Sequence, residues 1–377
     1  MSRLARVESF VFRCPIASPV RTSFGVMSER VGVFVRAEDA DGAYGWGEIW
    51  ANFPAASAEH RALLLDSVIA PRYLGQSIDD PAAVWAEGER GLHVLRVQSG
   101  DAGALSAAAA GLDLALHDLR ARKREMPLWA ALGGEDGSAV PAYASGLNPG
   151  PAAHDLVIAA RARGFRGFKI KLGFGREADI DTMRPIAAGL AAGERMMVDI
   201  NQGWDVVEAC FMADRLRQFP LTWIEEPLAA DRPAWEWAQV AAAAMVPLAG
   251  GENLRGALAF EDARYLAVVQ PDAAKWGGAS ACLQVGRAAL LGGRSYCPHF
   301  LGGAIGLVHS LHLLATVRGP GMLEVDFNAN PVREALLDGL MDLQHGCVAL
   351  PTGPGLGFDP DLARLAEYRT LHTERRS

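Results

Sequence analysis

Two lysines separated by a single residue give the first chemical signal in this sequence. Lys169 and Lys171 alternate with apolar residues in the stretch Gly167–Lys171, a pattern that predicts a short β-strand. Side chains two residues apart project from the same side of a strand, about 7 Å apart. Repulsion between two ammonium groups, together with burial, favours a lowered pKa and a lysine that acts as a base. Taken alone, the pair could also be a solvated strand face or a phosphate-binding patch.

Further along the chain, ionisable residues recur at the ends of short apolar runs. Eight such runs alternate with helical stretches: Ala142–Ser145, Gly167–Lys171, Arg195–Asn201, Leu221–Glu225, Pro247–Gly251, Val268–Asp272, Gly293–His299 and Met322–Val325. This alternation predicts a parallel sheet closed into a barrel, an architecture that carries its active site at the C-terminal ends of the strands. Seven ionisable residues end, follow or lie within these runs: Lys171, Asp199, Glu225, Glu252, Asp272, His299 and Glu324.

Charged groups that converge on one barrel mouth repel each other and lose hydration unless a cation and a substrate neutralise them. Asp199, Glu225 and Glu252 belong to three consecutive strands of the predicted barrel. Three hard oxygen ligands without histidine or cysteine suit Mg²⁺, with waters and substrate completing an octahedron. Any one of these acids alone could instead form a salt bridge or cap a helix. The three together predict a magnesium site.

Length and composition limit the class of protein. The chain has 377 residues, half of them hydrophobic, so we expect one large domain or two. A net charge of −8 argues against nucleic acid as a partner. The five cysteines are widely spaced and include no CxxC pair, which fits a reducing cytoplasm. Neither a signal-peptide apolar region nor a stretch of transmembrane length is found, so we expect a cytoplasmic protein without a membrane partner.

The first hundred residues predict an α+β segment. Expected strands and helices are Val7–Phe12, Val31–Glu38 and Ala43–Trp50, the last two joined at Asp41-Gly42, with helices over Ala56–Ile69 and Ala82–Gly91. Two stretches have the composition of loops, namely Ala17–Gly25, which contains Arg21 and Phe24, and Trp50–Pro54. A long Ala/Leu-rich helix is expected over Ala104–Lys123.

Taken together, these motifs resemble the enolase superfamily, in its mandelate racemase subgroup. The matching segments cover nearly the whole chain: Lys169–Lys171, Val198–Asn201, Trp223–Pro227, Gly251–Asn253, Pro271–Gly278, His299, Glu324, and the helix Ala109–Arg120 with Pro127-Leu128 and Leu132–Gly134. The resemblance implies a TIM-like (β/α)7β barrel at residues 128–345 and an α+β capping domain at residues 1–127. It also implies that residues 346–377 return to the capping domain.

The same resemblance implies Mg²⁺-assisted removal of a proton α to a carboxylate, through an enediolate intermediate. A divalent cation on the carboxylate oxygens stabilises the charge that develops there. We expect Lys171 to be the base on one face of the substrate, with Lys169 lowering its pKa. His299, oriented by Asp272, is expected to act on the opposite face. Glu324, if protonated, would donate a hydrogen bond to the second carboxylate oxygen.

The resemblance also suggests residues that contact the substrate. Ser145 corresponds to a serine near the substrate carboxylate, Asn201 lies in the Val198–Asn201 motif, and Arg21, Phe24 and Trp50 lie in loops expected to cap the barrel mouth. Relatives similar to muconate cycloisomerases and dipeptide epimerases have a lysine in place of Asp272, so Asp272 with His299 argues against that subgroup. Lys275 is expected to support this pair or to cover the rim, and His309 and His312 to be structural.

These observations predict a lyase that dehydrates an acid sugar or related hydroxy acid to a 2-keto acid, in carbohydrate acid catabolism. The alternative is a racemase or epimerase of a 2-hydroxy acid, with Lys171 and His299 on opposite faces. A third hypothesis is an inactive barrel with a binding role, although such a barrel has no need for this set of converging charges. We expect a small-molecule carboxylate substrate and a homo-oligomer.

Overall fold

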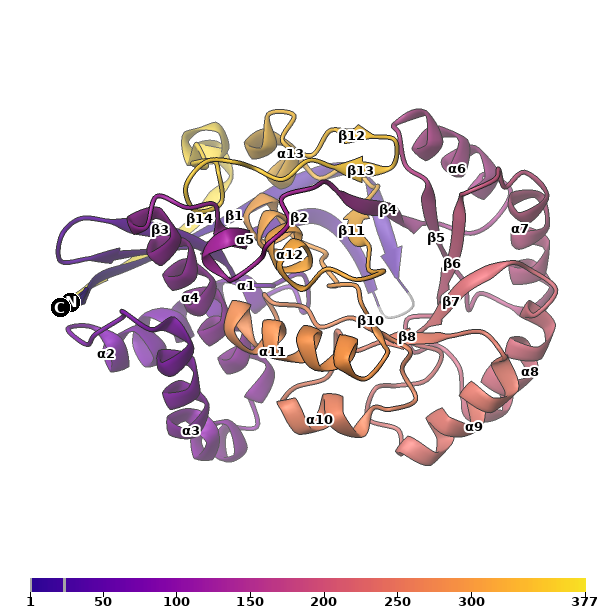
Figure 1. Ribbon diagram of the computed structural model, residues 1–377, viewed down its shortest axis with the longest axis horizontal. Helices are drawn as coiled ribbons and strands as arrows, with labels where there is room; N and C mark the ends of the chain where they lie inside the picture. Colours follow the sequence, from indigo (N-terminus) through magenta and orange to yellow (C-terminus); the bar gives the residue numbers. More distant parts are fainter. Residues whose placement is uncertain (1, 23–24) are drawn as a thin grey trace.

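The computed structural model describes residues 2–22 and 25–377 and begins with an antiparallel sheet in the strand order β14-β1-β2-β3 (Figure 1). Its strands are β1 (Leu4–Thr22), β2 (Gly25–Asp39), β3 (Tyr44–Glu48) and β14 (Arg369–Arg376). β14, from the C-terminal end of the chain, pairs with β1, and Ser377 donates a backbone hydrogen bond to Ala5 at 3.0 Å. The two ends of the chain therefore lie side by side (Figure 1).

β1 and β2 form a hairpin much longer than the sequence pattern predicts. Their pairing runs from Leu4–Asp39 as far as Thr22–Gly25, with an irregularity between Pro15 and Val20. The stretch Ala17–Gly25, predicted as a loop, is therefore mostly strand. Its Ser-Pro composition produces a break in register rather than an end of pairing, because the ladder resumes beyond it. Phe24 lies outside the described residues.

Helices cover one face of this sheet. They are α1 (Ser57–Leu64), a π-helical turn η1 (Leu65–Ile69), α2 (Ala70–Tyr73), α3 (Pro81–Ser99) and α4 (Ala102–Lys123). α4 is buried around most of its circumference, as expected of a helix that is apolar on nearly every face. It lies directly on β3, where a Cβ on Gly45 or Gly47 would come within 2.2 or 2.1 Å of α4 backbone atoms. These two glycines allow the close contact.

The second part of the chain forms the predicted (β/α)7β barrel. Its parallel strands are β4 (Val140–Leu147), β5 (Gly167–Lys171), β6 (Arg195–Asp199), β7 (Leu221–Glu225), β8 (Leu248–Gly250), β9 (Val268–Val269), β10 (Ser295–Tyr296) and β11 (Leu323–Asp326). β11 pairs with β4 and so returns to the start of the sheet. The barrel with its N-terminal capping domain confirms the predicted fold class.

Helices surround the barrel (Figure 1). They are α5 (Leu128–Ala131), α6 (Ala153–Ala162), α7 (Arg176–Ala188), α8 (Val206–Leu216), α9 (Ala234–Ala244), α10 (Ala257–Asp262), α11 (Gly278–Leu291), α12 (Ala304–Val317) and α13 (Pro331–Leu337). Between the barrel and β14 come the short hairpin β12 (Leu343–Gln344) and β13 (Cys347–Val348) and the 3-10 helix η2 (Leu362–Tyr368). Within the described residues, every helix is too short or too polar to cross a membrane.

Strand register brings chemically active residues together. In the parallel ladder, Lys171 is the partner of Asp199, and Asp199 is the partner of Glu225. β8, β9 and β10 are shorter than predicted, so Asp272 and His299 lie in loops beyond the strand ends. Because a loop residue is free of the alternation of a strand, its side chain can turn into the barrel mouth. Below this level, buried side chains close the barrel interior: Tyr143, Met197, Trp223, Ala249, Val268, Cys297 and Met322.

A buried carboxylate joins the capping domain to the barrel. Glu48 ends β3, is 1% exposed, and accepts hydrogen bonds from the backbone N–H groups of Gly303 and Gly306 at the start of α12. A Cβ on Gly302 or Gly303 would come within 2.8 or 2.9 Å of this carboxylate, so glycine is required there. Burial raises the pKa of Glu48 to about 7, although the backbone donors lower it. Glu48 thus fixes the helix that follows the loop carrying His299.

This raised pKa predicts pH-dependent stability. The folded protein favours the neutral form of Glu48 up to pH 7, whereas the unfolded chain ionises near pH 4.5. The contribution of neutral Glu48 to the free energy of unfolding is therefore fully present below pH 4.5, and it is lost as the pH rises through 7. Glu48→Gln removes this titration, so between pH 5 and 8 the wild type should lose about 2–3 kcal/mol more free energy of unfolding than the variant. Urea unfolding at both pH values measures the difference. Equal losses in the two proteins would contradict the assignment.

Candidate active site

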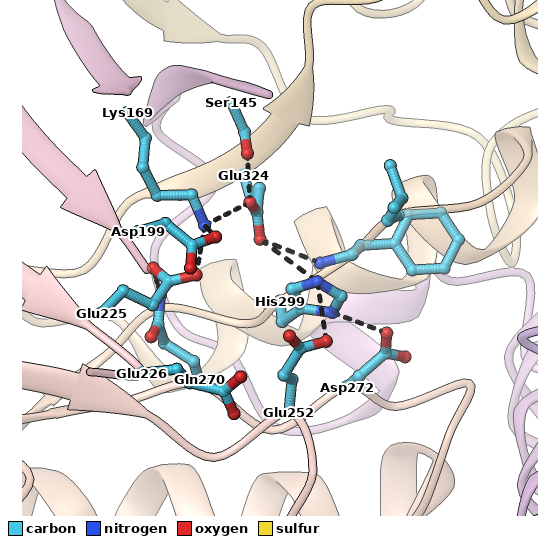
Figure 2. A network of polar contacts seen from close by, with 12 residues as sticks. Ser145, Lys169, Asp199, Glu225, Glu226, Glu252, Gln270, Asp272, His299 and Glu324 are labelled. Atoms are coloured by element: carbon cyan, nitrogen blue, oxygen red, sulfur yellow. Dashed lines mark hydrogen bonds and ion pairs between the residues drawn. The ribbon is translucent and has the colours of Figure 1, made fainter. Parts of the chain in front are cut away.

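The two lysines of β5 contact carboxylates of other barrel strands, and Figure 2 shows Lys169 among them. Lys171 donates hydrogen bonds to Asp199 Oδ2 and Asn201 Oδ1, both at 2.6 Å. Lys169 donates to Glu225 and forms an ion pair with Glu324 Oε1 at 2.7 Å. The Lys169 side chain is 1% exposed and that of Lys171 is 16% exposed. Lys171 therefore reaches the barrel mouth, whereas Lys169 lies beneath it.

The expected lowering of the lysine pKa is wrong for this arrangement. Burial lowers the pKa of Lys171, and so does the charge of Lys169, but the attraction of Asp199 outweighs both and leaves the pKa raised. Burial likewise lowers the pKa of Lys169, whereas Glu225 and Glu324 hold it well above its usual range. The two lysines do lie together, as their spacing predicts. Carboxylates from the neighbouring strands reverse the sign of the shift.

His299 and Asp272 form a buried pair. The His299 Nδ1 atom lies 2.8 Å from Asp272 Oδ2, while Asp272 Oδ1 accepts the backbone N–H of Ala274 at 2.8 Å. The imidazole Nε2 lies 3.1 Å from Glu252 Oε2. Burial lowers the pKa of His299, but Glu252, Glu324 and Asp272 raise it to about 9. The pairing with Asp272 fixes the ring and leaves Nε2 as the atom available for chemistry.

Glu324 accepts hydrogen bonds on both carboxylate oxygens. Ser145 Oγ donates to Oε1, where Lys169 also contacts it, and the backbone N–H of Phe300 donates to Oε2 at 3.3 Å. Burial raises the pKa of Glu324, but Lys169 and His299 together lower it by more than burial raises it. The pKa of Glu324 is therefore below its usual range. Glu324 is therefore an ionised acceptor in this structure. The condition for the expected hydrogen-bond donor, a protonated Glu324, is not favoured here, because two cationic neighbours stabilise its charge.

The three predicted metal ligands surround the same mouth, and each already has a positively charged or hydrogen-bonding partner. Asp199 contacts Lys171, and Glu252 Oε2 lies 2.9 Å from the ammonium of Lys275. Glu225 contacts Lys169 and also accepts hydrogen bonds from Gln270 at 2.7 Å and from Trp223 at 3.1 Å. The oxygens of the three carboxylates are not gathered within 4.8 Å of one another. The Gln270 carbonyl oxygen is buried without a hydrogen-bond partner.

Charge balance shows that this donor set fits a divalent cation. Four cationic groups lie at or just beneath the mouth, namely the ammonium groups of Lys169, Lys171 and Lys275 and the imidazolium of His299. Six carboxylates face them, those of Asp199, Glu225, Glu226, Glu252, Asp272 and Glu324. Burial, followed by repulsion from Glu252 and Asp199, raises the pKa of Glu226 well above its usual range. Burial also raises the pKa of Glu225 to about 7. Burial is the main cause of both shifts, with repulsion between carboxylates adding to it. The carboxylates still outnumber the cations at the mouth, and a bound divalent cation would neutralise this excess.

Among the described residues, metal-type ligand atoms within 4.8 Å of one another are found at Glu8, His372 and Glu374 on the capping sheet. Glu8 there lies 2.9 Å from the guanidinium of Arg36 and 3.6 Å from that of Arg6. Because two arginines already balance the charge of Glu8, this group has little need of a cation. The barrel mouth is therefore the better candidate for a metal site.

Two adjoining hollows form a cleft above these charges, and Lys171, His299 and Leu301 border both. The larger hollow has a volume of about 270 Å³, and its other lining residues are Trp50, Phe53, Asn201, Gln202, Glu252, Asn253 and Lys275. The smaller one is also lined by Val20, Met27, Ser145, Gly146, Asn148, Glu324, Asp326 and Asn328. Both the capping domain and the barrel thus contribute to the walls.

Of the predicted substrate-binding residues, Ser145, Asn201 and Trp50 line this cleft. Arg21 belongs to β1, and Phe24 lies outside the described residues. Sequence reasoning missed several lining residues: Val20, Met27, Asn148, Gln202, Leu301, Asp326 and Asn328. Most of them end a barrel strand or follow its end by a few positions, which is a signal that could have been used. Val20 and Met27 could not be found, because their hairpin was taken for a loop.

Other polar residues near the site have structural roles. His309 Nε2 lies 2.8 Å from the carbonyl oxygen of Trp46, and His312 Nδ1 accepts the backbone N–H of Trp129 at 3.1 Å. Burial lowers the pKa of His309 to about 3 and that of His312 to about 4, so both are neutral. The ammonium of Lys275 contacts Glu252 and Asn253, while its backbone N–H donates to Asp272 Oδ1 at 3.1 Å.

Comparisons with known proteins agree with this geometry. Residues 6–133 match the family model for the N-terminal domain of mandelate racemase / muconate lactonizing enzyme, and residues 152–364 match the model described as enolase C-terminal domain-like. A crystal structure described as mandelate racemase/muconate lactonizing enzyme from Bordetella bronchiseptica RB50 is 48% identical. It superimposes with a TM-score of 0.91, covering 98% of this chain and 100% of that one.

Two further relatives bear on chemistry. A racemase from Streptomyces coelicolor A3(2), crystallised with bound magnesium, is 28% identical with a TM-score of 0.86, covering 97% of this chain and 100% of that one. L-talarate/galactarate dehydratase from Salmonella typhimurium is 33% identical over 77% of this chain and 71% of its own length. Other curated relatives are named as sugar-acid cycloisomerases and muconate cycloisomerases.

The position of Lys169 predicts a large effect on stability. Lys169→Met removes the cation that Glu225 and Glu324 share, and at pH 8 their ionised carboxylates would be left short of a buried partner. We expect a loss of about 3–5 kcal/mol in the free energy of unfolding, measured by urea denaturation in the presence of a chelator. Arg184→Met is the control, because Arg184 is exposed and pairs only with Asp181 on the surface. Its loss should stay below about 1 kcal/mol. Similar losses in both variants would refute the role of Lys169.

Proposed function

The chain belongs to the mandelate racemase/muconate lactonizing enzyme family of the enolase superfamily, and we propose that it is a Mg²⁺-dependent lyase. In this proposal it removes the proton α to a carboxylate and dehydrates an acid sugar or related hydroxy acid to a 2-keto acid. The observation that carries the proposal is the position of Lys171 and His299, which border both hollows of one cleft. A substrate between them would have one proton-transfer group on each side.

The surplus of carboxylates supports a metal at Asp199, Glu225 and Glu252, as does the magnesium bound by the Streptomyces relative. When bound, Mg²⁺ supplies Lewis-acid stabilisation of the negative charge that develops on the substrate carboxylate. The carboxylate donors suit this ion, since they are hard oxygen ligands at the ends of consecutive strands.

The chain's own residues move the protons. Lys171 Nζ reaches the cleft, and as the neutral amine it would accept the α-proton and become an ammonium. A cation bound at Asp199 would weaken the attraction that keeps Lys171 protonated in its absence. Lys169 stays buried and holds Glu225 and Glu324 in place. His299, with Nδ1 held by Asp272, offers Nε2 as a general acid to a β-hydroxyl that departs as water. Loss of that hydroxyl gives an enol, which becomes a 2-keto acid.

Two features favour dehydration over the alternatives. The smaller hollow has polar walls from Ser145, Asn148 and Asn328, which suit a hydroxylated chain. The Salmonella relative bears the name of a sugar-acid dehydratase. A racemase of a 2-hydroxy acid is the second candidate, favoured by the two proton-transfer groups on the same cleft and by the apolar walls of Trp50 and Phe53.

Removing one ligand tests the metal site. Glu225→Gln eliminates a charged oxygen ligand, so Mg²⁺ affinity measured by calorimetry should fall by more than about tenfold. Glu177→Gln is the matched control, because Glu177 is an exposed acid on α7 that pairs with Arg215. The Mg²⁺ affinity of the Glu177→Gln variant should equal that of the wild type. Unchanged affinity in Glu225→Gln would remove this carboxylate from the metal site.

Product chemistry in D₂O separates the two candidate reactions. A screen of acid sugars with Mg²⁺ should yield a 2-keto acid that semicarbazide traps. His299→Asn should reduce this product by about 10²–10⁴-fold, because the general acid is lost, while Lys171 still exchanges the α-proton for deuterium. Deuterated starting acid of inverted configuration, with no trapped 2-keto acid, would replace the lyase by the racemase.

A further inference from the structure

A third hollow, of about 170 Å³, lies between the capping helices and the loops that follow β8 and β9. Its lining residues are Trp50, Arg61, Gly103, Ala107, Glu252, Asn253, Arg255 and Lys275. Four of these, Trp50, Glu252, Asn253 and Lys275, also line the larger hollow of the cleft. The third hollow therefore adjoins the candidate active site, and the mechanism above makes no use of it.

Arg61, from α1, brings an unbalanced charge to this hollow. Its residue is 8% exposed, yet among the described residues no carboxylate forms an ion pair with it. The guanidinium donates to the carbonyl oxygens of Trp50 and Phe53 and lies 5.1 Å from the centre of the Trp50 ring. Its Nε atom is buried without a hydrogen-bond partner. Buried arginines are normally paired with an anion. Asp101 and Asp272 attract Arg61 and raise its pKa, but their ion-pair contacts are with His60 and His299, so neither is a direct counter-ion of Arg61.

Burial lowers the pKa of Arg61 only to about 10, so the group is a cation at neutral pH. The ammonium of Lys275 and the exposed guanidinium of Arg255 add positive charge to the walls. Glu252 is the one carboxylate among the lining residues, and it is already in contact with Lys275 and His299. The net charge of the side chains that line the hollow is therefore positive.

Two kinds of uncharged hydrogen-bond donor at the hollow also favour an anionic ligand. Gly103 belongs to the first turn of α4, and the N-terminus of a long helix presents N–H groups and a positive dipole end. The indole Nε1 of Trp50 is buried without a partner. The hollow thus contains several donors and cations and a single, already occupied, acceptor. Its volume equals that of five or six waters at about 30 Å³ each, enough for a carboxylate or a phosphate.

We propose that this hollow, which we call the Arg61 subsite, binds a small oxyanion next to the candidate active site. The same chemistry has two possible sources: a free anion, or the second carboxylate of a dicarboxylic substrate held by its other end between Lys171 and His299. The second source rests on the proposed function, whereas the binding of an oxyanion as such does not.

Direct binding tests the subsite independently of catalysis. Calorimetry with inorganic phosphate, on protein treated with a chelator, should show binding that Arg61→Met weakens at least tenfold. Arg255→Met tests the same site without touching the loop contacts of Arg61, and it should weaken binding severalfold. Arg184→Met, on the far surface of α7, should bind as the wild type does. Absence of phosphate binding, or equal affinity in all four proteins, would overturn the proposal.

Substrate kinetics identify the source of the anion. If it is a second carboxylate, a sugar diacid should have a kcat/KM at least tenfold above its monoacid counterpart, and Arg61→Met and Arg255→Met should reduce that ratio. Phosphate should then raise the KM of the diacid. Equal kcat/KM values for diacid and monoacid, with phosphate still bound, would exclude the second carboxylate and assign the subsite to a free anion. Failure of every acid to exchange its α-proton would refute the proposed function and leave the phosphate result standing.

Discussion

Carboxylates outnumber ammonium groups where the barrel strands end, and this imbalance governs the rest of the site. Lys169 lies at its centre, because it is buried between Glu225 and Glu324 and cannot be hydrated there. Burial is the main cause of the raised pKa of Glu225 and Glu226, and repulsion from neighbouring carboxylates adds to it. So many buried carboxylates in one place are tolerated only where a ligand of opposite charge neutralises them. A divalent cation would do so.

The capping domain is held to the barrel at the loop that carries His299 and at the helix that follows this loop. Glu48 accepts two N–H groups at the start of α12, and the loop before that helix carries His299. Asn52 donates to the carbonyl oxygen of Leu301 at 2.6 Å in the same loop. The capping domain also supplies Trp50 and Phe53 to the cleft wall. The proposed substrate contacts and the position of His299, the proposed general acid, are therefore set by one interface, so a change in either domain should affect both.

Spacing alone was sufficient to place the ligand-bearing strands, because each parallel strand ends at the same rim of the barrel. Lys171, Asp199 and Glu225 are direct partners in register, as one ionisable residue per strand end suggests. The pKa of Lys171 could not be predicted, since it depends on Asp199 from a neighbouring strand. The extent of the β1–β2 hairpin was also missed, because a strand with a register break has the local composition of a loop. The charge of Arg61 has no local signal either, since it stands out only through the absence of a partner in three dimensions.

The claim that surplus negative charge at the barrel mouth demands a divalent cation can be tested directly by crystallography with Mn²⁺ in place of Mg²⁺. Anomalous scattering locates that ion independently of any assumption about ligands. We predict one strong peak bounded by Asp199, Glu225 and Glu252, with Lys171 no longer in contact with Asp199. A peak at Glu8, His372 and Glu374 with none at the barrel mouth would contradict the account.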